Sequence, residues 1–278
     1  MRRLLRQAKR RSLLLLVRFK LWSDVYFSGA EALRFVCNIC GTACCVPLSV
    51  ISRECPSCYG CGSTVRYRSV INALLAGLDL SLKPLRLHPM RKNIVGIGMT
   101  DSETYADRLQ RMFSYKNTYC HKEPRLDILN VDSPGYGCAD FIICSDVLEH
   151  VCPPVSVAFQ NLYRLLKPGG VLVLTVPLVE DALAKEHFPN LSEYHFELLG
   201  DRRVLINKTS GGSYEEFDDL VFHVGEGETL EMRLFSREWL LEELTKAGFG
   251  KIRVMDEEYS EYGILWRQDR SVSILAWK

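Results

Sequence analysis

Two short and almost uninterrupted apolar runs, separated by a segment with helical spacing, form the clearest pattern along this chain. The runs cover residues 140–145 and 171–176, and the helical segment between them covers 153–166. A polar turn follows the first run at 145–150, and Pro168-Gly169-Gly170 precedes the second run. Strands that are apolar on both faces are typical of parallel sheets covered by helices. The pattern therefore predicts a β-α-β unit.

Weaker patterns on both sides extend this unit into a larger sheet. The other predicted elements are a strand at 93–98, a helix at 103–113 capped by Thr100, Asp101 or Ser102, a strand at 117–120, a helix at 237–247, and two strands near 252–256 and 271–277. We expect the last two strands to form an antiparallel hairpin at the sheet edge. The predicted fold class is α/β, with a Rossmann-like and mostly parallel sheet.

The order of residues in the β-α-β unit resembles the fourth and fifth motifs of class I S-adenosylmethionine-dependent methyltransferases of type 11. Asp140 stands where an acid opens the fourth strand in that family, and the turn at 145–150 (SDVLEH) stands where the family's turn lies under the cofactor. Residues 165–170 (LLKPGG) then lead into the fifth strand. The resemblance implies a methyltransferase domain over 88–278, S-adenosylmethionine as cofactor, and methyl transfer to an acceptor.

The resemblance also implies cofactor contacts after the first strand. The family pattern there is an acid, an apolar residue and then Gly-x-Gly-x-Gly. Here Gly98 is in register, Gly96 replaces the acid, and Asp101 replaces a later glycine. Glycine is needed where the backbone comes close to a ligand. A carboxylate near the cofactor's amino group is usual in this family, so either Asp101 takes that role or water holds the group.

Other residues match further cofactor contacts of the family. Glu123 follows the predicted second strand, where an acid typically accepts hydrogen bonds from ribose hydroxyls; the alternative is a surface residue. Asp127 lies 13 residues before Asp140, at the position of the acid that contacts adenine; the alternative is a turn cap. Ser145 and Asp146 complete the expected site, because ligands bind at the carboxyl ends of the strands in such sheets.

Seven of the eleven cysteines lie between residues 37 and 61. Cys37-x-x-Cys40 and Cys58-x-x-Cys61 have the spacing of two zinc knuckles, and the 17 residues between them suit one tetrahedral site. Pairing with Cys55 and Cys58 leaves 14 residues instead, and a reduced cluster or disulfides are further alternatives. Four protein ligands leave no open position, so the predicted zinc is structural. We expect a zinc-knuckle module with a linking helix at 33–87.

About fifty residues between the fifth strand and the last helix carry no regular pattern and are rich in His, Tyr and acidic residues. Such segments usually cover the acceptor pocket in this superfamily, so residues 179–233 are the expected acceptor-side insertion, made of irregular loops. Transfer to a hydroxyl needs a residue that removes its proton. His150 and His187 are the main candidates, ahead of Tyr194, His195 and His223. The expected acceptor is a small molecule or a sugar- or lipid-linked compound, methylated on oxygen.

The formal net charge of +1 hides an uneven distribution. Residues 1–91 carry 15 Lys/Arg and 4 Asp/Glu, whereas residues 92–278 carry 20 and 30. A basic helix expected at 1–32 would contact a membrane surface, a polyanion or the acidic body of the protein itself. Arg66 and Arg68 are expected to pair with carboxylates of the main domain, with phosphate binding as the alternative. No apolar run reaches the roughly 20 residues of a membrane span, so we expect a cytoplasmic protein, with or without peripheral membrane contact.

Two other functions stay open at this level. The basic zinc region suits docking of RNA, and Asp146-x-x-Glu149-His150 resembles the metal-binding arrangement of terminal-RNA ribose methyltransferases. However, the sequence lacks an Asn-Pro-Pro-Tyr-type motif, which argues against methylation of base amino groups. The irregular first motif also leaves room for a non-catalytic scaffold of the same fold.

Overall fold

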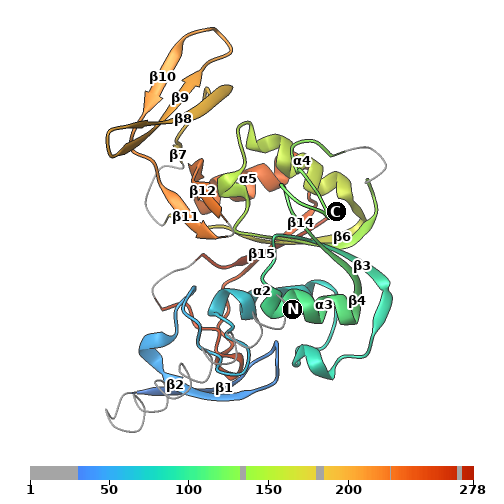
Figure 1. Cartoon of the computed structure of the whole chain (residues 1–278). Coiled ribbons are helices and arrows are strands. Elements are labelled where there is room, and N and C mark those ends of the chain that lie inside the picture. The colour runs from blue at the N-terminus through green and yellow to red at the C-terminus, as the bar shows by residue number, and fades with distance from the viewer. Residues whose placement is uncertain (1–30, 132–135, 180–184, 226, 268–270) are drawn as a thin grey trace.

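A six-stranded sheet forms the centre of the protein (Figure 1). The computed structural model describes residues 31–131, 136–179, 185–225, 227–267 and 271–278. The strand order is β14-β15-β6-β5-β3-β4, where the strands are β3 (Arg91–Met99), β4 (Phe113–Thr118), β5 (Ala139–Ser145), β6 (Leu166–Thr175), β14 (Lys251–Met255) and β15 (Ser273–Trp277). Strands β3, β4, β5 and β6 are parallel to one another. At one edge β15 pairs antiparallel with β6, and β14 pairs antiparallel with β15. The predicted Rossmann-like fold and its antiparallel C-terminal pair are therefore confirmed.

Two layers of helices cover the sheet. Helices α4 (Val155–Leu165) and α5 (Arg237–Ala247) lie on one face, and α2 (Val65–Gly77) and α3 (Glu103–Met112) lie on the other (Figure 1). Alternate residues of β5 enter the two cores, because Ile142 packs with α4 and α5 whereas Phe141 and Ile143 pack with α2 and α3. This double burial explains the continuous apolar run that predicted β5.

The predicted strand at 117–120 needs correction. Strand β4 begins at Phe113, not at residue 117, since helix α3 already ends at Met112. In β4 the buried Phe113 and Tyr115 alternate with exposed Ser114 and Lys116, which is the period of a half-buried strand.

The segment 31–64 forms a small β-hairpin and the cysteine-bearing turns below the sheet in Figure 1. Its strands are β1 (Ala32–Val36) and β2 (Ala43–Pro47), and the single-turn helix η1 (Leu48–Val50) follows them. Two further single-turn helices, η2 (Leu85–Leu87) and η5 (Ser260–Tyr262), lie outside this segment. Phe35 and Val46 of this hairpin share one apolar core with α2, α3 and one face of the sheet. The basic helix expected at 1–32 falls almost entirely outside the described residues.

The segment 179–233, expected as an acceptor-side insertion and called the insertion below, contains several strands among its described residues, so the expectation of irregular loops was wrong. Strands β8 (Glu193–Leu199), β9 (Arg202–Lys208) and β10 (Tyr214–Phe217) form an antiparallel sheet that projects from the body in Figure 1. Below it lie the hairpin β11–β12 (Phe222–Gly225 and Gly227–Leu230) and the short pair β7–β13 (Lys185–Glu186 and Arg233–Leu234). None of the described helices has the length and apolar character needed to cross a membrane.

Candidate functional site

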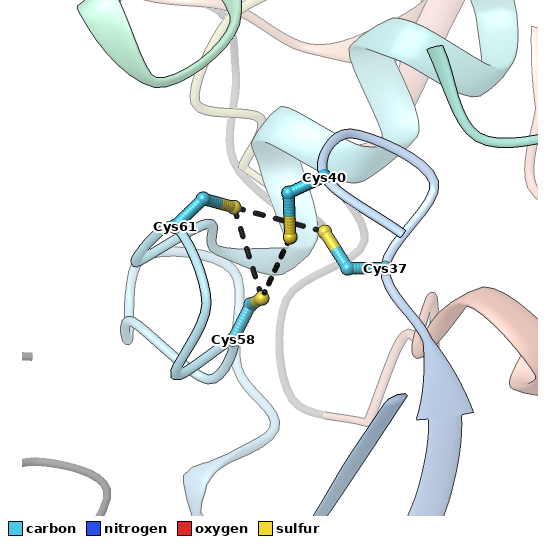
Figure 2. A group of neighbouring side chains, drawn as sticks. All are labelled: Cys37, Cys40, Cys58 and Cys61. Carbon is cyan, nitrogen blue, oxygen red and sulfur yellow. Dashed lines mark hydrogen bonds between the residues drawn. The ribbon is translucent and has the colours of Figure 1, made fainter. Parts of the chain in front are cut away.

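Four cysteines converge beside the N-terminal end of α2 (Figure 2). The sulfur of Cys37 lies 3.7 Å from that of Cys61, and Cys58 lies 3.5 Å from Cys40 and 3.7 Å from Cys61. Four thiolates at about 2.3 Å from a tetrahedral zinc ion are about 3.8 Å apart, so these distances suit such an ion. Cys55, the alternative ligand considered from the sequence, is not a member of this group.

The two cysteine turns have the same backbone geometry, which explains the glycine after each of them. Gly41 and Gly62 both have left-handed φ angles, +75° and +72°. The amide of Gly41 donates to the carbonyl of Cys37 at 2.7 Å, and that of Gly62 donates to the carbonyl of Cys58 at 2.6 Å. Glycine adopts this conformation without a steric penalty. Each Cys-x-x-Cys-Gly turn thereby aims two thiols at one point.

Arg53 of the segment 31–64 and Arg66 of the first turn of α2 reach the carboxyl edge of the main sheet. Arg53 donates to both carboxylate oxygens of Asp146, at 2.6 and 2.9 Å, and Arg66 lies 3.2 Å from the same carboxylate. Asp146 also accepts from the Thr175 hydroxyl at 2.9 Å. Burial alone would raise the pKa of Asp146, but the two guanidinium groups hold it below its usual range. The carboxylate therefore stays charged and fixed.

Arg66 also contacts Ser145, the residue before Asp146. Its Nη1 donates to the Ser145 hydroxyl at 2.9 Å, while the half-exposed Glu54 binds its other face at 2.6 and 2.8 Å. The expectation that Arg66 pairs with a main-domain carboxylate is confirmed. Arg68 instead lies fully buried, donating to the carbonyls of Ser63 and Gly263 at 2.8 Å each.

The glycines at the end of β3 make room for aromatic side chains of the neighbouring strands. A Cβ on Gly96 would lie 2.1 Å from the ring of Phe141, and one on Gly98 would lie 1.8 Å from the Tyr115 hydroxyl. Asp101 accepts from both Tyr115 and Tyr105, the latter at 2.8 Å. Burial raises the pKa of Asp101 to about 7, against the opposing effect of the two hydroxyls. Its carboxyl group thus binds the protein's own tyrosines.

Glu123 and Asp127 lie in the turns after β4, on the same edge of the sheet. Glu123 is exposed and accepts from the amide of Arg125 at 3.0 Å. Asp127 accepts from the amide of Leu129 at 3.0 Å and from the side chain of Asn130 at 2.8 Å, which is the turn-capping arrangement left open from the sequence. A carboxylate has about four acceptor sites, so both Glu123 and Asp127 keep acceptor sites that these contacts do not use.

His150 lies in the single turn η4 (Leu148–His150), directly after β5. Its Nδ1 lies 2.9 Å from the carbonyl of Leu230, which makes Nδ1 the protonated nitrogen and leaves a lone pair on Nε2. Burial lowers the pKa of His150, so the ring is neutral near pH 7. Its neighbour Glu149 is 1% exposed, and burial followed by the charge of Asp146 raises the pKa of that carboxyl.

The insertion places two more histidines beside His150. The ring of His223 packs edge-on against that of His150, with centroids 4.9 Å apart. Glu231 joins His223 and His187, because its two oxygens lie 3.1 and 3.2 Å from their Nε2 atoms. His195 pairs with Glu197 on exposed β8 and is separate from this group. Three of the candidate histidines therefore converge.

Nothing in the sequence pattern singles out Arg53 or Glu231 as site residues. Arg53 contacts Asp146, which lies 93 residues away in the sequence, and Glu231 contacts His187, which lies 44 residues away. Neither residue belongs to a spaced motif. Glu231 carried one signal, since it lies in a stretch of acids close to a histidine.

A family model described as a methyltransferase domain matches residues 91–253. The chain belongs to this family. The match begins at β3, runs through the sheet and the insertion, and ends in β14. Family membership makes S-adenosylmethionine the expected methyl donor, whereas the cysteine segment lies outside the matched range.

Solved structures of similar fold include other methyltransferases. CalS10, an amino pentose methyltransferase from Micromonospora echinaspora, is 14% identical, with a TM-score of 0.43 over 78% of this chain and 93% of that one. An S-adenosylmethionine-dependent methyltransferase from Clostridium acetobutylicum is 13% identical, with a TM-score of 0.38 over 67% and 85%. These similarities are too distant to identify the acceptor. No curated protein matches the chain.

Proposed function

We propose that this protein transfers a methyl group from S-adenosylmethionine to an oxygen atom of a small molecule or of a sugar- or lipid-linked acceptor. The observation that carries the proposal is the set of polar groups at one edge of the sheet. Glu123 and Asp127 follow β4, whereas Ser145 ends β5 and Asp146 follows it. Both strands pair in parallel with β3, so these residues lie at the same edge. Ligands of open α/β sheets bind at this edge.

The chemical character of these residues suits the donor. Glu123 has free acceptor sites for the two ribose hydroxyls, and Asp127 has free acceptor sites for the adenine amine. Arg66 offers a guanidinium group for the methionine carboxylate, which would replace the half-exposed Glu54, one of the present partners of Arg66. Asp101 binds Tyr105 and Tyr115, so we assign it to holding the end of β3 and not to the donor's amino group.

S-adenosylmethionine supplies a methyl group on a positively charged sulfur, and the protein has to place the acceptor and remove its proton. We assign proton removal to His187, whose imidazole is held by Glu231 at 3.2 Å. The carboxylate stabilises the ring once it has taken the proton, as in other His–carboxylate pairs. His150 remains the second candidate.

We further propose a structural zinc ion on Cys37, Cys40, Cys58 and Cys61. The support is the 3.5–3.7 Å spacing of the sulfurs together with the paired glycine turns. All four positions are filled by protein, so the ion has no open site for a substrate.

Calorimetric titration with S-adenosylhomocysteine tests the donor site. Loss of a hydrogen-bonded acceptor costs about 1–3 kcal/mol, so Asp127→Ala and Glu123→Ala should each weaken binding by about tenfold or more. Glu197→Ala, an exposed acid on β8, is the matched control and should bind as the wild type does. A wild-type protein that gives no heat with either the donor or its product would identify a non-catalytic scaffold.

A further inference from the structure

A second cluster of metal-ligating groups lies at the junction of η4 and the insertion. One ligand atom each from Glu149, His150 and His223 lies within 4.8 Å of the other two. The cluster is separate from the cysteines and from Asp146, whose carboxylate is held by Arg53 and Thr175. We propose that Glu149, His150 and His223 bind a divalent transition-metal ion.

The buried carboxylate of Glu149 is the strongest reason for placing a cation here. Its side chain is 1% exposed, and neither of its oxygens accepts a hydrogen bond from the described residues. Its nearest cationic candidate is His150, whose Nε2 lies 3.8 Å from Oε1. A buried carboxylate without a partner costs several kcal/mol. A bound cation removes that cost, and the two neighbouring imidazoles complete its ligands.

His150 and His223 are oriented by neighbouring groups in the way that metal-binding histidines are oriented in other proteins. Metal-binding histidines usually donate their other ring nitrogen to a carbonyl or pair it with a carboxylate. Here Nδ1 of His150 donates to the Leu230 carbonyl at 2.9 Å, which turns the lone pair of Nε2 toward Glu149. Glu231 lies 3.1 Å from the ring of His223 and fixes that ring beside His150.

The insertion is also firmly attached at this point. The amide of Met232 donates to the Glu149 carbonyl at 2.7 Å, and Arg233 donates to the carbonyl of Leu148 and to Glu186. The ligands from η4 and from β11 are therefore held in one place. Ligand atoms around an ion at about 2.0–2.2 Å lie about 3 Å apart, so small side-chain rotations close the cluster around it.

The ligand chemistry selects the class of ion. Two imidazoles and one carboxylate favour Zn²⁺, Fe²⁺, Co²⁺ or Mn²⁺ over Mg²⁺ or Ca²⁺, which prefer oxygen ligands alone. Three protein ligands leave at least one position open, and His223 is about one-third exposed. His187 lies close to the site, because Glu231 contacts both His187 and His223.

The role of the ion rests on the proposed function, although its binding does not. An acceptor hydroxyl on the open position would be oriented by the ion, and its pKa would fall, since a bound metal lowers the pKa of an oxygen ligand strongly. The site then selects acceptors with a hydroxyl that can ligate a metal. His150 is a ligand in this arrangement, which leaves His187 to take the proton.

Cobalt titration of protein that already carries zinc on its cysteines tests the site. We expect one further equivalent of Co²⁺ to bind, with a visible spectrum that lacks strong thiolate charge-transfer bands. Glu149→Gln and His223→Ala should each weaken this binding by at least tenfold. His195→Ala, an exposed histidine of the same insertion, should leave it unchanged.

A second measurement separates metal binding from misfolding. Without added Co²⁺, Glu149→Gln should be at least as stable as the wild type, because the neutral amide has nearly the shape of the carboxyl group and removes the cost of burying an acidic one. With Co²⁺, the wild type should gain thermal stability and Glu149→Gln should not. The proposal is overturned if the wild type binds no second ion, if the cobalt spectrum shows thiolate bands alone, or if Glu149→Gln binds cobalt as tightly as the wild type.

Titration of the same samples with S-adenosylhomocysteine keeps the two proposals distinguishable. Binding of S-adenosylhomocysteine without binding of cobalt would overturn the metal site alone. Binding of cobalt without S-adenosylhomocysteine would overturn the proposed function and leave the metal site.

Discussion

Asp146 shows how one residue can be fixed from several parts of the chain. It has a left-handed φ of +52°, which costs energy for a residue other than glycine. Its amide donates to the Thr175 carbonyl at 2.9 Å, and its carboxylate is held by Arg53 and Arg66. The surrounding contacts thus impose the conformation at the start of the expected active-site turn.

Arg53→Gln should destabilise the protein by about 3 kcal/mol, because it leaves Asp146 buried with one guanidinium partner in place of two. Chemical denaturation measures the loss. Arg202→Gln removes an exposed pair with Asp218 and should cost less than about 1 kcal/mol. Equal effects of the two variants would contradict the view that Arg53 is structurally important.

The buried Asp101 should make stability depend on pH. Its pKa is about 7 in the folded protein and near 3.8 when unfolded, so the folded state binds the extra proton between these values. Stability from this group is therefore present at low pH and is lost as the pH rises toward 7. The free energy of unfolding of the wild type, relative to Asp101→Asn, should fall by a few kcal/mol between pH 4 and 7.5. A constant difference across this range would show that Asp101 titrates normally.

At the scale of elements, the sequence predicted those parts whose pattern comes from burial on both sides. β5 and β6 are apolar throughout because helices cover both faces of the sheet. β4 was placed four residues late, since Phe113 and Tyr115 fit the end of a helix as well as a strand. The insertion strands were missed because β8 is exposed along most of its length and so carries no apolar alternation.

In the candidate sites, too, local features could be predicted from the sequence, whereas contacts between distant residues could not. The four cysteines could be chosen from their spacing, because both turns are local. The positions of the acids came only from resemblance to the family, and the partners of Asp146, Asp101 and Glu149 could not be predicted. Those partners depend on contacts between distant parts of the chain, such as Arg53 with Asp146, which lie 93 positions apart.

The packing between β3 and β5 gives a prediction at this scale. In Gly96→Ala the added Cβ would lie 2.1 Å from the Phe141 ring, so overpacking should cost about 1–3 kcal/mol. Phe141→Leu makes room, and the double variant should be more stable than the sum of the two single losses predicts. In Gly250→Ala the added Cβ would meet no atom of the described residues within 4 Å, and stability should change by less than about 0.5 kcal/mol. Additive losses would show that the two residues do not touch.

In the whole molecule, the cysteine-bearing segment 31–64 belongs to the hydrophobic core and also reaches the carboxyl edge of the main sheet. Figure 1 places it against α2 and below the main sheet, and its apolar residues join the core formed by α2, α3 and β5. Arg53 lies between the two cysteine turns in sequence, and Arg66 follows the second. A zinc ion on the cysteines would therefore hold both arginines in place at the proposed donor site.

This arrangement predicts that the metal and the donor site are coupled. Cys58→Ser should lose zinc, because structural sites need all four ligands. With the turns released, Arg53 and Arg66 should leave Asp146 and Ser145, and binding of S-adenosylhomocysteine should weaken by at least tenfold. Cys55→Ser lies in the same segment but outside the four-cysteine group, and it should keep both zinc and full affinity. Metal analysis and calorimetry on the same samples decide the matter. If Cys58→Ser loses its zinc yet binds S-adenosylhomocysteine as the wild type does, the segment only supports the fold, and the arginines are held at the sheet edge by Asp146 alone.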